Sequence, residues 1–202
     1  MAGNDLRADL DVFLAGHEAE LIEFRRDLHA HPELAHAEHR TTRRIALRLA
    51  AEGLRPVILP KGTGLLVDIA SPDYPEQKNP AERSVVALRA DIDALPMADE
   101  KDVPYRSTVP GACHACGHDV HATVLLGAGL FLAGQAAAGL LPGRVRLVFQ
   151  PAEEAAGGAL DVLAAGGIAS VGRIFALHCD PRLDAGQLGV RSGAITAACD
   201  KI

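Results

Sequence analysis

The chain has 202 residues, of which 49% are hydrophobic and 23% are charged, and its formal net charge is -6. This length and composition describe an ordinary globular chain of about one domain. The negative charge leaves no basic surface for nucleic acid, and an aromatic content of 3% argues against a platform for stacking bases. We therefore expect no nucleic-acid partner.

The N-terminal segment and the cysteines predict a cytoplasmic protein. Asp5 and Asp9 lie where a secretory signal would carry positive charge. No stretch is apolar for long enough, without glycine, proline or charge, to predict a membrane span, so we expect no membrane partner. Two of the four cysteines lie beside histidine in the segment 113–116. That placement favours reduced thiols over disulfides.

Two amphipathic helices are predicted in the first quarter of the chain. They span residues 10–28 and 38–54, and Gly53 is a suitable C-terminal stop for the second. The connector between them, residues 29–36, contains three histidines but no cysteine. We expect these histidines to be solvated or to cap a helix, because isolated motif matches often mislead.

Three strands are predicted between residues 55 and 92. Residues 55–59 and 64–70 are predicted to form short strands. Residues 71–83 contain three prolines and are predicted to form a surface excursion. Residues 84–92 form a nearly continuous apolar run that ends in acids. This pattern is typical of a central strand whose C-terminal end lies at a functional site.

Asp91 and Asp93 stand at the end of this central strand. Because they are two residues apart, their side chains lie on the same side of an extended chain. We interpret them as carboxylates that bind a metal or orient its ligands. The alternative is a solvated strand end with a turn cap.

Strands and helices alternate in the second half of the chain. The predicted elements are a helix over 122–138, a strand over 144–149, a helix over 159–165, a strand over 173–178, and shorter strands over 186–191 and 194–198. This alternation predicts an α/β fold with a mostly parallel sheet between helices. We assign residues 1–202 to one part of a single domain.

The segment 114–121, with the sequence HACGHDVH, is the richest in possible metal ligands. Thiolate and neutral imidazole together are the donors that a borderline-soft divalent ion prefers, and Asp119 is placed to orient a ring nitrogen. The segment immediately precedes the apolar helix over 122–138. It therefore sits in a loop that opens a buried helix, where α/β folds place their chemistry.

Two further groups could complete such a site. Glu153 and Glu154 follow the strand over 144–149, and His178 ends the strand over 173–178. Of two adjacent carboxylates, one can bind a metal while the other handles protons. Taken alone, the Glu pair could be a charged helix start, and His178 an ordinary histidine at a strand end. Together with the segment 114–121, they predict a metallohydrolase.

With these motifs in this order, the chain resembles the dinuclear metal-dependent amidohydrolases. That family includes hippurate hydrolase, indole-acetyl-amino-acid hydrolase and N-acyl-amino-acid amidohydrolase, and it is related to the aminoacylases and metallocarboxypeptidases. The motifs that carry the resemblance are LRADIDALP at 88–96, HACGHDVH at 114–121, QPAEE at 150–154 and ALH at 176–178. The resemblance runs from about Leu21 to the end of the chain.

The resemblance implies a role for each site residue. Glu153 would be the general base, taking a proton from water and later delivering it to the leaving nitrogen. Asp93 would support catalysis by fixing ligand orientation. The Cys116 thiolate would be shared between two ions. The implied metal ligands are Cys116, His118, Glu154 and His178.

Three other residues have less definite roles under the resemblance. His121 and Asp119 are further candidates for fixing ligand orientation. Asp91 stands where aminoacylase relatives carry a ligand histidine, so its role is open.

The implied activity is hydrolysis of a small-molecule N-acyl amino acid to a carboxylate and a free amino acid. The cofactors would be two divalent ions, zinc or manganese, with cobalt or nickel as alternatives. The alternative activities are those of a dipeptidase or an N-acetyl-diaminopimelate deacetylase. A non-catalytic metal-binding domain is another alternative, whereas a structural zinc site is disfavoured by the Glu pair.

The resemblance also implies that the chain is the N-terminal part of the family's catalytic domain. A dimerisation domain, through which the full-length family forms homodimers, and a C-terminal part with one more histidine ligand are expected to be absent from these 202 residues.

Overall fold

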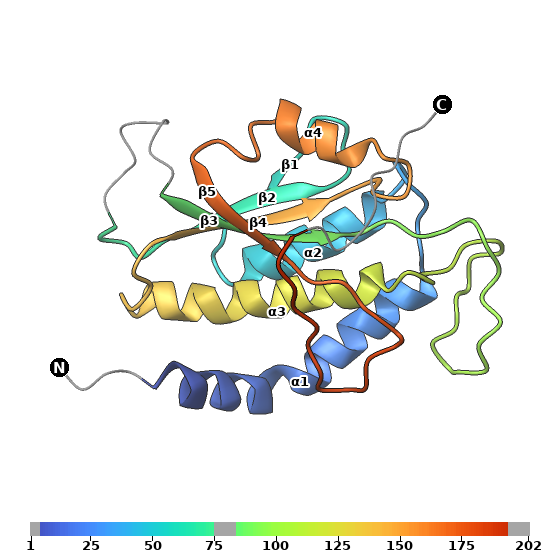
Figure 1. Cartoon of the computed structure of the whole chain (residues 1–202), viewed down its shortest axis with the longest axis horizontal. Helices are drawn as coiled ribbons and strands as arrows, with labels where there is room; N and C mark the ends of the chain where they lie inside the picture. The colour runs from blue at the N-terminus through green and yellow to red at the C-terminus, as the bar shows by residue number, and fades with distance from the viewer. Residues whose placement is uncertain (1–4, 75–83, 194–202) are drawn as a thin grey trace.

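A computed structural model describes residues 5–74 and 84–193, which form a sheet with helices on both faces (Figure 1). The five strands are arranged in the order β1-β2-β4-β3-β5. In chain order the elements are α1 (Leu6–Ala30), α2 (His39–Ala51), β1 (Val57–Ile58), β2 (Leu65–Ile69), β3 (Val85–Asp91), α3 (His118–Ala137), β4 (Arg144–Gln150), α4 (Gly158–Ala164) and β5 (Val171–Ala176).

The sheet is mixed, with its parallel strands at one side. β3 pairs in parallel with both β4 and β5, whereas β2 is antiparallel to β4 and to β1. The α/β class is therefore confirmed, but the predicted dominance of parallel pairing holds only for the three strands β4, β3 and β5. β1 and β2 are antiparallel because a short turn joins them and leaves no room for a crossover helix.

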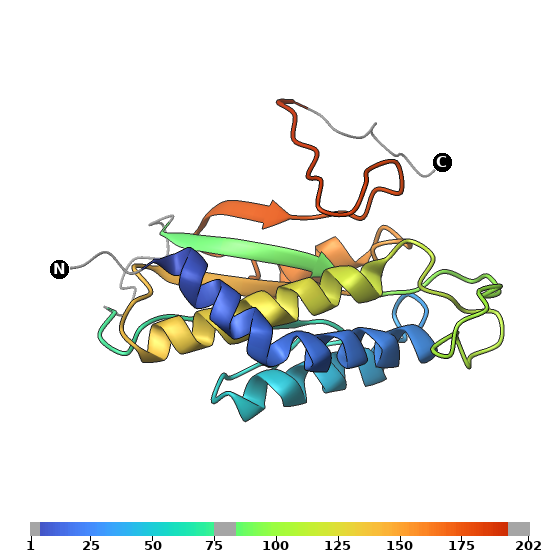
Figure 2. The ribbon, with the colours of Figure 1, turned by 90° about the horizontal axis from the view of Figure 1, so that it is seen from below.

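Most of the core lies on the sheet face covered by α1, α2 and α3. Leu65, Leu147 and Phe149 are fully buried there against Leu126 of α3. Alternate residues of the same strands point to the opposite face, where α4 covers a smaller cluster around Val148. α1 lies beside α3 on the larger face, and β5 forms one edge of the sheet (Figure 2). The two covered faces explain why the central strands are apolar on both sides.

By length and composition α3 could cross a membrane, contrary to our expectation that no stretch would qualify. In the structure, however, 56% of the most apolar stretch of this helix is buried within the protein. Gly129 permits the close approach of this helix to the sheet, because an added Cβ would lie 2.5 Å from Cδ1 of Leu147. We interpret α3 as the core helix of the domain.

The helices α1 and α3 each begin four residues earlier than predicted, because the residue before each one favours a helix start there. The carboxylate of Asp5 accepts hydrogen bonds from the backbone N–H groups of Arg7 and Ala8, so α1 begins at Leu6. Gly117 adopts a left-handed conformation with φ of +90° and ends the preceding loop. The helix α3 therefore begins at His118, within the segment that is rich in metal ligands.

The predicted strand over 186–191 is not present. Leu188 and Val190 are 72% and 83% exposed, and Gly186 has a φ of +87°, which an extended strand does not allow. An apolar alternation forms a strand only where a neighbouring strand can pair with it, and none does so here in the described part of the chain. The predicted strand over 194–198 and most of the excursion over 71–83 lie outside the described residues.

Replacing Leu147 with alanine is expected to destabilise the fold strongly. Its side chain is fully buried and packs against α3, so the variant loses apolar contacts and leaves a cavity costing about 2–5 kcal/mol. Chemical denaturation measures the loss. Leu160→Ala is the matched control: Leu160 is 65% exposed on α4, and its loss should change stability by less than about 0.5 kcal/mol. Equal effects of the two substitutions would contradict this packing.

Candidate metal centre

The predicted site residues meet at one edge of the sheet. The carboxyl ends of β3 and β4 are aligned, with Asp91 opposite Gln150, and β5 runs in the same direction beside β3. The amino end of α3 lies at this same edge (Figure 1). Side chains from the ends of three strands and the start of one helix are thereby collected in one place.

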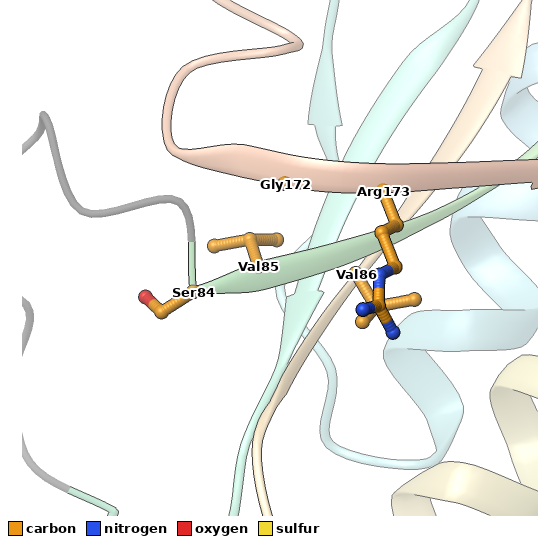
Figure 3. Close-up of a pocket in the computed structure, with 5 residues that line it drawn as sticks. All are labelled: Ser84, Val85, Val86, Gly172 and Arg173. Carbon is orange, nitrogen blue, oxygen red and sulfur yellow. The ribbon is translucent and has the colours of Figure 1, made fainter.

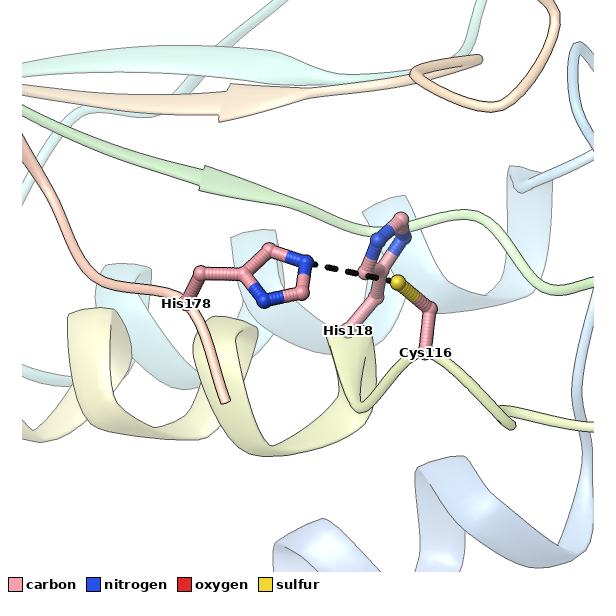
Figure 4. Close-up of side chains that lie close together, drawn as sticks. All are labelled: Cys116, His118 and His178. Atoms are coloured by element: carbon pink, nitrogen blue, oxygen red, sulfur yellow. Dashed lines mark hydrogen bonds between the residues drawn. The ribbon is translucent and has the colours of Figure 1, made fainter. Parts of the chain in front are cut away.

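Cys116, His118 and His178 converge at this edge (Figure 4). The Cys116 sulfur lies 3.4 Å from Nε2 of His178. Sγ of Cys116 and one ring nitrogen from each of the two histidines all lie within 4.8 Å of one another. The structure therefore brings together three of the four predicted metal ligands around one point, from segments 60 residues apart in the sequence.

Asp93 holds the ring of His118. The carboxylate is buried and lies 3.2 Å from Nδ1 of His118, and it also accepts a hydrogen bond of 3.0 Å from the backbone N–H of Glu154. Burial raises the pKa of Asp93, but these hydrogen bonds and the charge of His118 outweigh it, so the pKa is lowered overall. Asp93 is thus favoured in its ionised form and holds the ring of His118 in place.

In both His118 and His178, Nδ1 contacts an oxygen acceptor, so Nε2 is the ring nitrogen left to face the other ligand candidates. With Nδ1 of His118 bonded to Asp93, its buried Nε2 has no hydrogen-bond partner among the described residues. In His178, Nδ1 donates to the carbonyl oxygen of Cys179 at 2.7 Å, which leaves the lone pair of Nε2 facing Cys116. Metal-binding histidines characteristically use one ring nitrogen for an oxygen acceptor and the other for the metal.

Glu153 and Glu154 complete the arrangement. One carboxylate oxygen of each and a ring nitrogen of His118 lie within 4.8 Å of one another. Oε1 of Glu154 is 3.8 Å from Nε2 of His118, which is too long for a hydrogen bond but leaves space for an ion between them. The fourth predicted ligand and the predicted base therefore lie beside His118, which belongs both to this group and to the group with Cys116 and His178.

Glu38 fixes the loop that carries the Glu pair, and the sequence patterns did not single it out. Its fully buried carboxylate accepts a hydrogen bond of 2.7 Å from the backbone N–H of Ala152. Ala152 has a φ of +47°, a strained conformation for a residue with a side chain. We infer that this bond from the start of α2 helps to keep the strained loop in place.

Asp91 and His121 form a second buried pair next to these ligands. Nδ1 of His121 lies 2.6 Å from Oδ1 of Asp91, whose other oxygen accepts from Arg89 at 2.6 Å. Burial raises the pKa of Asp91, but its hydrogen bond with His121 and the charges of His118 and Arg89 outweigh it, so the pKa falls to about 2. Nε2 of His121 accepts from the backbone N–H of Cys179 at 2.8 Å. Unlike His118, whose Nε2 has no partner among the described residues, His121 has both ring nitrogens engaged.

His29 is buried, contrary to the predicted solvated or capping role of the connector histidines. Its Nδ1 lies 2.7 Å from Asp119 and its Nε2 3.2 Å from Asp99. Arg25 also pairs with Asp119 at 2.8 Å. The expectation failed because the helix α1 continues to Ala30 and carries His29 into the core. Through Asp119, these residues anchor the first turn of α3, where His118 is located.

The donor set fits divalent cations. Sulfur, imidazole nitrogen and carboxylate oxygen are ligands that zinc and other first-row ions accept, and Nε2 of His118 is a buried ring nitrogen, with no hydrogen-bond partner among the described residues, that a cation would satisfy. Burial raises the pKa of the Cys116 thiol to about 12, and the charge of Glu154 adds to the rise. A bound cation acts in the opposite direction, because it stabilises the thiolate.

A shallow hollow elsewhere on the sheet carries no comparable donor set. It is lined by Val85, Val86, Gly172, Ser84 and Arg173, at the amino ends of β3 and β5 (Figure 3). Since the metal-ligand candidates lie at the carboxyl ends of these strands, the hollow is separate from the candidate metal centre.

The fold and the donor set define an α/β protein with a candidate metal centre at the carboxyl edge of its sheet. A family model described as Peptidase family M20/M25/M40 matches residues 87–198. The chain belongs to this family, which confirms the resemblance inferred from its motifs.

The similar proteins are considerably longer than this chain. The chain is 41% identical over 182 residues to an N-acetylcysteine deacetylase of Bacillus subtilis, a match that covers 90% of this chain and 45% of that protein. It is 50% identical over 186 residues to a Rhodococcus jostii protein whose name assigns it to the glutamate–cysteine ligases, covering 92% of this chain and 22% of that one. The chain thus spans less than half the length of these relatives.

A solved structure shares both the fold and the sequence pattern. The Bacillus subtilis YXEP protein, described as a dinuclear metal binding peptidase from the M20 family, matches with a TM-score of 0.79 and 40% identity. The match covers 89% of this chain and 47% of that one.

Proposed function

We propose that this chain is part of the catalytic domain of a metal-dependent amidohydrolase that acts on N-acyl amino acids. The products would be a carboxylate and a free amino acid. The cofactors would be two divalent ions, with zinc or manganese as the first candidates and cobalt or nickel as alternatives. A cytoplasmic location and a homodimer of the full-length protein stay predictions.

The observation that carries this proposal is the placement of the Glu pair beside the free ring nitrogen of His118. A structural metal site would need only ligands, whereas an additional carboxylate next to them provides a base. We assign Glu154 to the metal because its oxygen lies 3.8 Å from Nε2 of His118. Glu153, which lies in the same cluster, is then free to exchange protons.

The proposed ligands are Cys116, His118, His178 and Glu154. Cations held there would polarise the scissile carbonyl group and promote ionisation of the attacking water. Glu153 would accept the proton of that water and return it to the leaving nitrogen. Asp93 would keep His118 in its orientation, and Glu38 would hold the loop that aims Glu153.

The relatives support an N-acyl amino acid as the substrate class. One relative is named for removing the acetyl group of N-acetylcysteine, and the similar structure is described as a dinuclear metal binding peptidase. Both descriptions concern compounds with an amide bond. The ligase name of the Rhodococcus jostii relative concerns a protein of which only 22% is matched, so we base no substrate on it.

A hydrolysis assay tests the proposal. The chain is loaded with zinc or manganese and incubated with a panel of N-acetyl amino acids and dipeptides, and the freed amine is measured. We expect release from N-acetyl amino acids that stops on chelation and returns when the ion is restored. Release from dipeptides alone would favour the dipeptidase alternative, and a metal-loaded chain that frees no amine from any compound would contradict the proposal in favour of a non-catalytic metal-binding domain.

A further inference from the structure

The backbone of Cys179 connects two histidines at the candidate metal centre. Its N–H donates to Nε2 of His121 at 2.8 Å, and its carbonyl oxygen accepts from Nδ1 of His178 at 2.7 Å. The two rings also pack together, with their centroids 4.8 Å apart. The orientation of His178 is therefore linked to His121 through one residue of backbone.

These contacts determine which nitrogen of His121 carries its proton. A backbone N–H can only donate, so Nε2 of His121 must accept from Cys179, and Nδ1 must hold the proton that is shared with Asp91 at 2.6 Å. The lone pair of Nε2 is thus occupied by the protein itself. His121 is for this reason poorly placed to be a metal ligand, although one of its ring nitrogens lies within 4.8 Å of donors from Asp91 and His118.

Asp91 is in turn held in place by Arg89. Its second oxygen accepts from Arg89 at 2.6 Å, and the guanidinium of Arg89 also donates to Gln150 at 3.0 Å. His121 and Asp91 are 5% and 2% exposed, respectively, whereas His178 is exposed and lies beyond the last residue of β5. A buried, hydrogen-bonded pair therefore supports an exposed ligand candidate that follows an edge strand.

We propose that His121, held in place by Asp91, is a positioning residue that acts through the backbone of Cys179 to hold His178 ready to bind metal. The inference rests on the proposed function, since it concerns a ligand of the proposed metal centre. It assigns His121 a role that is neither direct ligation nor simple core packing. The position of Cys179 agrees with this role. Its sulfur lies 3.1 Å from the position that a Cβ on Gly117 would take, and Gly117 is the residue between Cys116 and His118 in the sequence.

Three substitutions of His121 separate these roles. In His121→Gln the amide oxygen can take the place of Nε2 and accept from Cys179, but the side chain no longer bonds Asp91 in the same way. In His121→Asn the amide nitrogen takes the place of Nδ1 and reaches Asp91, but nothing reaches Cys179. His121→Phe keeps a ring against His178 and loses both bonds. The affinity of each variant for zinc, and the absorption spectrum of its cobalt form, are compared with the unchanged chain.

We expect His121→Asn and His121→Phe to bind zinc about 10–100-fold more weakly, with an altered cobalt spectrum, and His121→Gln to recover most of the affinity. Full zinc affinity in His121→Phe would overturn the inference. So would equal losses in all three variants, as a direct ligand would give, or better recovery in His121→Asn than in His121→Gln. Thermal unfolding of the metal-free variants shows that each one is folded.

A measurement without metal separates this inference from the proposed function. Nitrogen-15 NMR of the metal-free chain reports which ring nitrogen of His121 carries the proton, and we expect Nδ1. A proton on Nε2 would overturn the inference even if metal binds. A chain with the expected tautomer that binds no metal would instead contradict the proposed function, and with it the positioning role.

Discussion

Glu153→Gln is expected to reduce amide hydrolysis by about 10²–10⁴-fold while the metal content stays unchanged. The amide keeps the size of the side chain but cannot accept a proton, and general-base catalysis contributes a factor of this order. The Glu153 carboxylate belongs to the cluster around His118, yet it is not among the proposed ligands. Turnover of an N-acetyl amino acid and elemental analysis of the same sample measure the two properties.

Glu154→Gln provides the matched control, because it is the same substitution on the adjacent residue. Oε1 of Glu154 faces Nε2 of His118 at 3.8 Å, so its loss should lower metal binding together with activity. If Glu153→Gln lost its metal and Glu154→Gln kept it, the two roles would have to be exchanged. If both variants kept full activity, the Glu pair would have no part in the reaction.

Cys116→Ser is expected to lower metal affinity by more than the roughly 10–100-fold that loss of a supporting hydrogen-bond partner costs. Serine is nearly the same size as cysteine, but its hydroxyl is a far poorer ligand for zinc than a thiolate. In the structure, Sγ of Cys116 is 3.4 Å from His178 and within 4.8 Å of a ring nitrogen of His118. Competition with a chelator of known affinity measures the change.

Cys113→Ser is the control for this substitution. Cys113 is a free thiol three residues earlier, 2% exposed, and it lies near His29 and Asp99 instead of His178. Both nitrogens of His29 already contact carboxylates, so we expect no metal at that second group. Loss of metal in Cys113→Ser with retention in Cys116→Ser would move the site to this neighbouring cluster.

The convergence of the metal-ligand candidates could be predicted from the sequence. The ends of parallel strands meet at one edge of a sheet, so acids and histidines that follow apolar runs are brought together whatever their separation in sequence. This reasoning located Asp93, Glu153, Glu154 and His178 beside the segment 114–121. Whether these residues bind metal stays a prediction until the ion is measured.

The contacts that hold the ligand candidates could not be predicted in this way. Glu38 bonds the backbone of Ala152, 114 residues away, and His121 bonds the backbone of Cys179, 58 residues away. A backbone N–H is present at every residue except proline, so a sequence pattern does not mark the one that is used. The burial of His29 likewise depends on Asp119, 90 residues further along the chain.

The boundaries of the sheet also depended on partners that local sequence does not reveal. Residues 186–191 alternate as a strand does, yet no neighbouring strand pairs with them and they remain a loop in the described part of the chain. The pairing of β2 with β4 is antiparallel, although the alternating pattern of the second half favoured parallel strands. Pairing direction is set by the connections between strands.

The proposed metal centre is best tested by the metal content of the purified chain, determined by elemental mass spectrometry alongside Cys116→Ser. We expect close to two divalent ions per chain, by analogy with the dinuclear relative, and a clear loss in the variant. A content no higher than that of Cys116→Ser would contradict it, because the convergent thiol and imidazoles would then not form a metal centre in this chain.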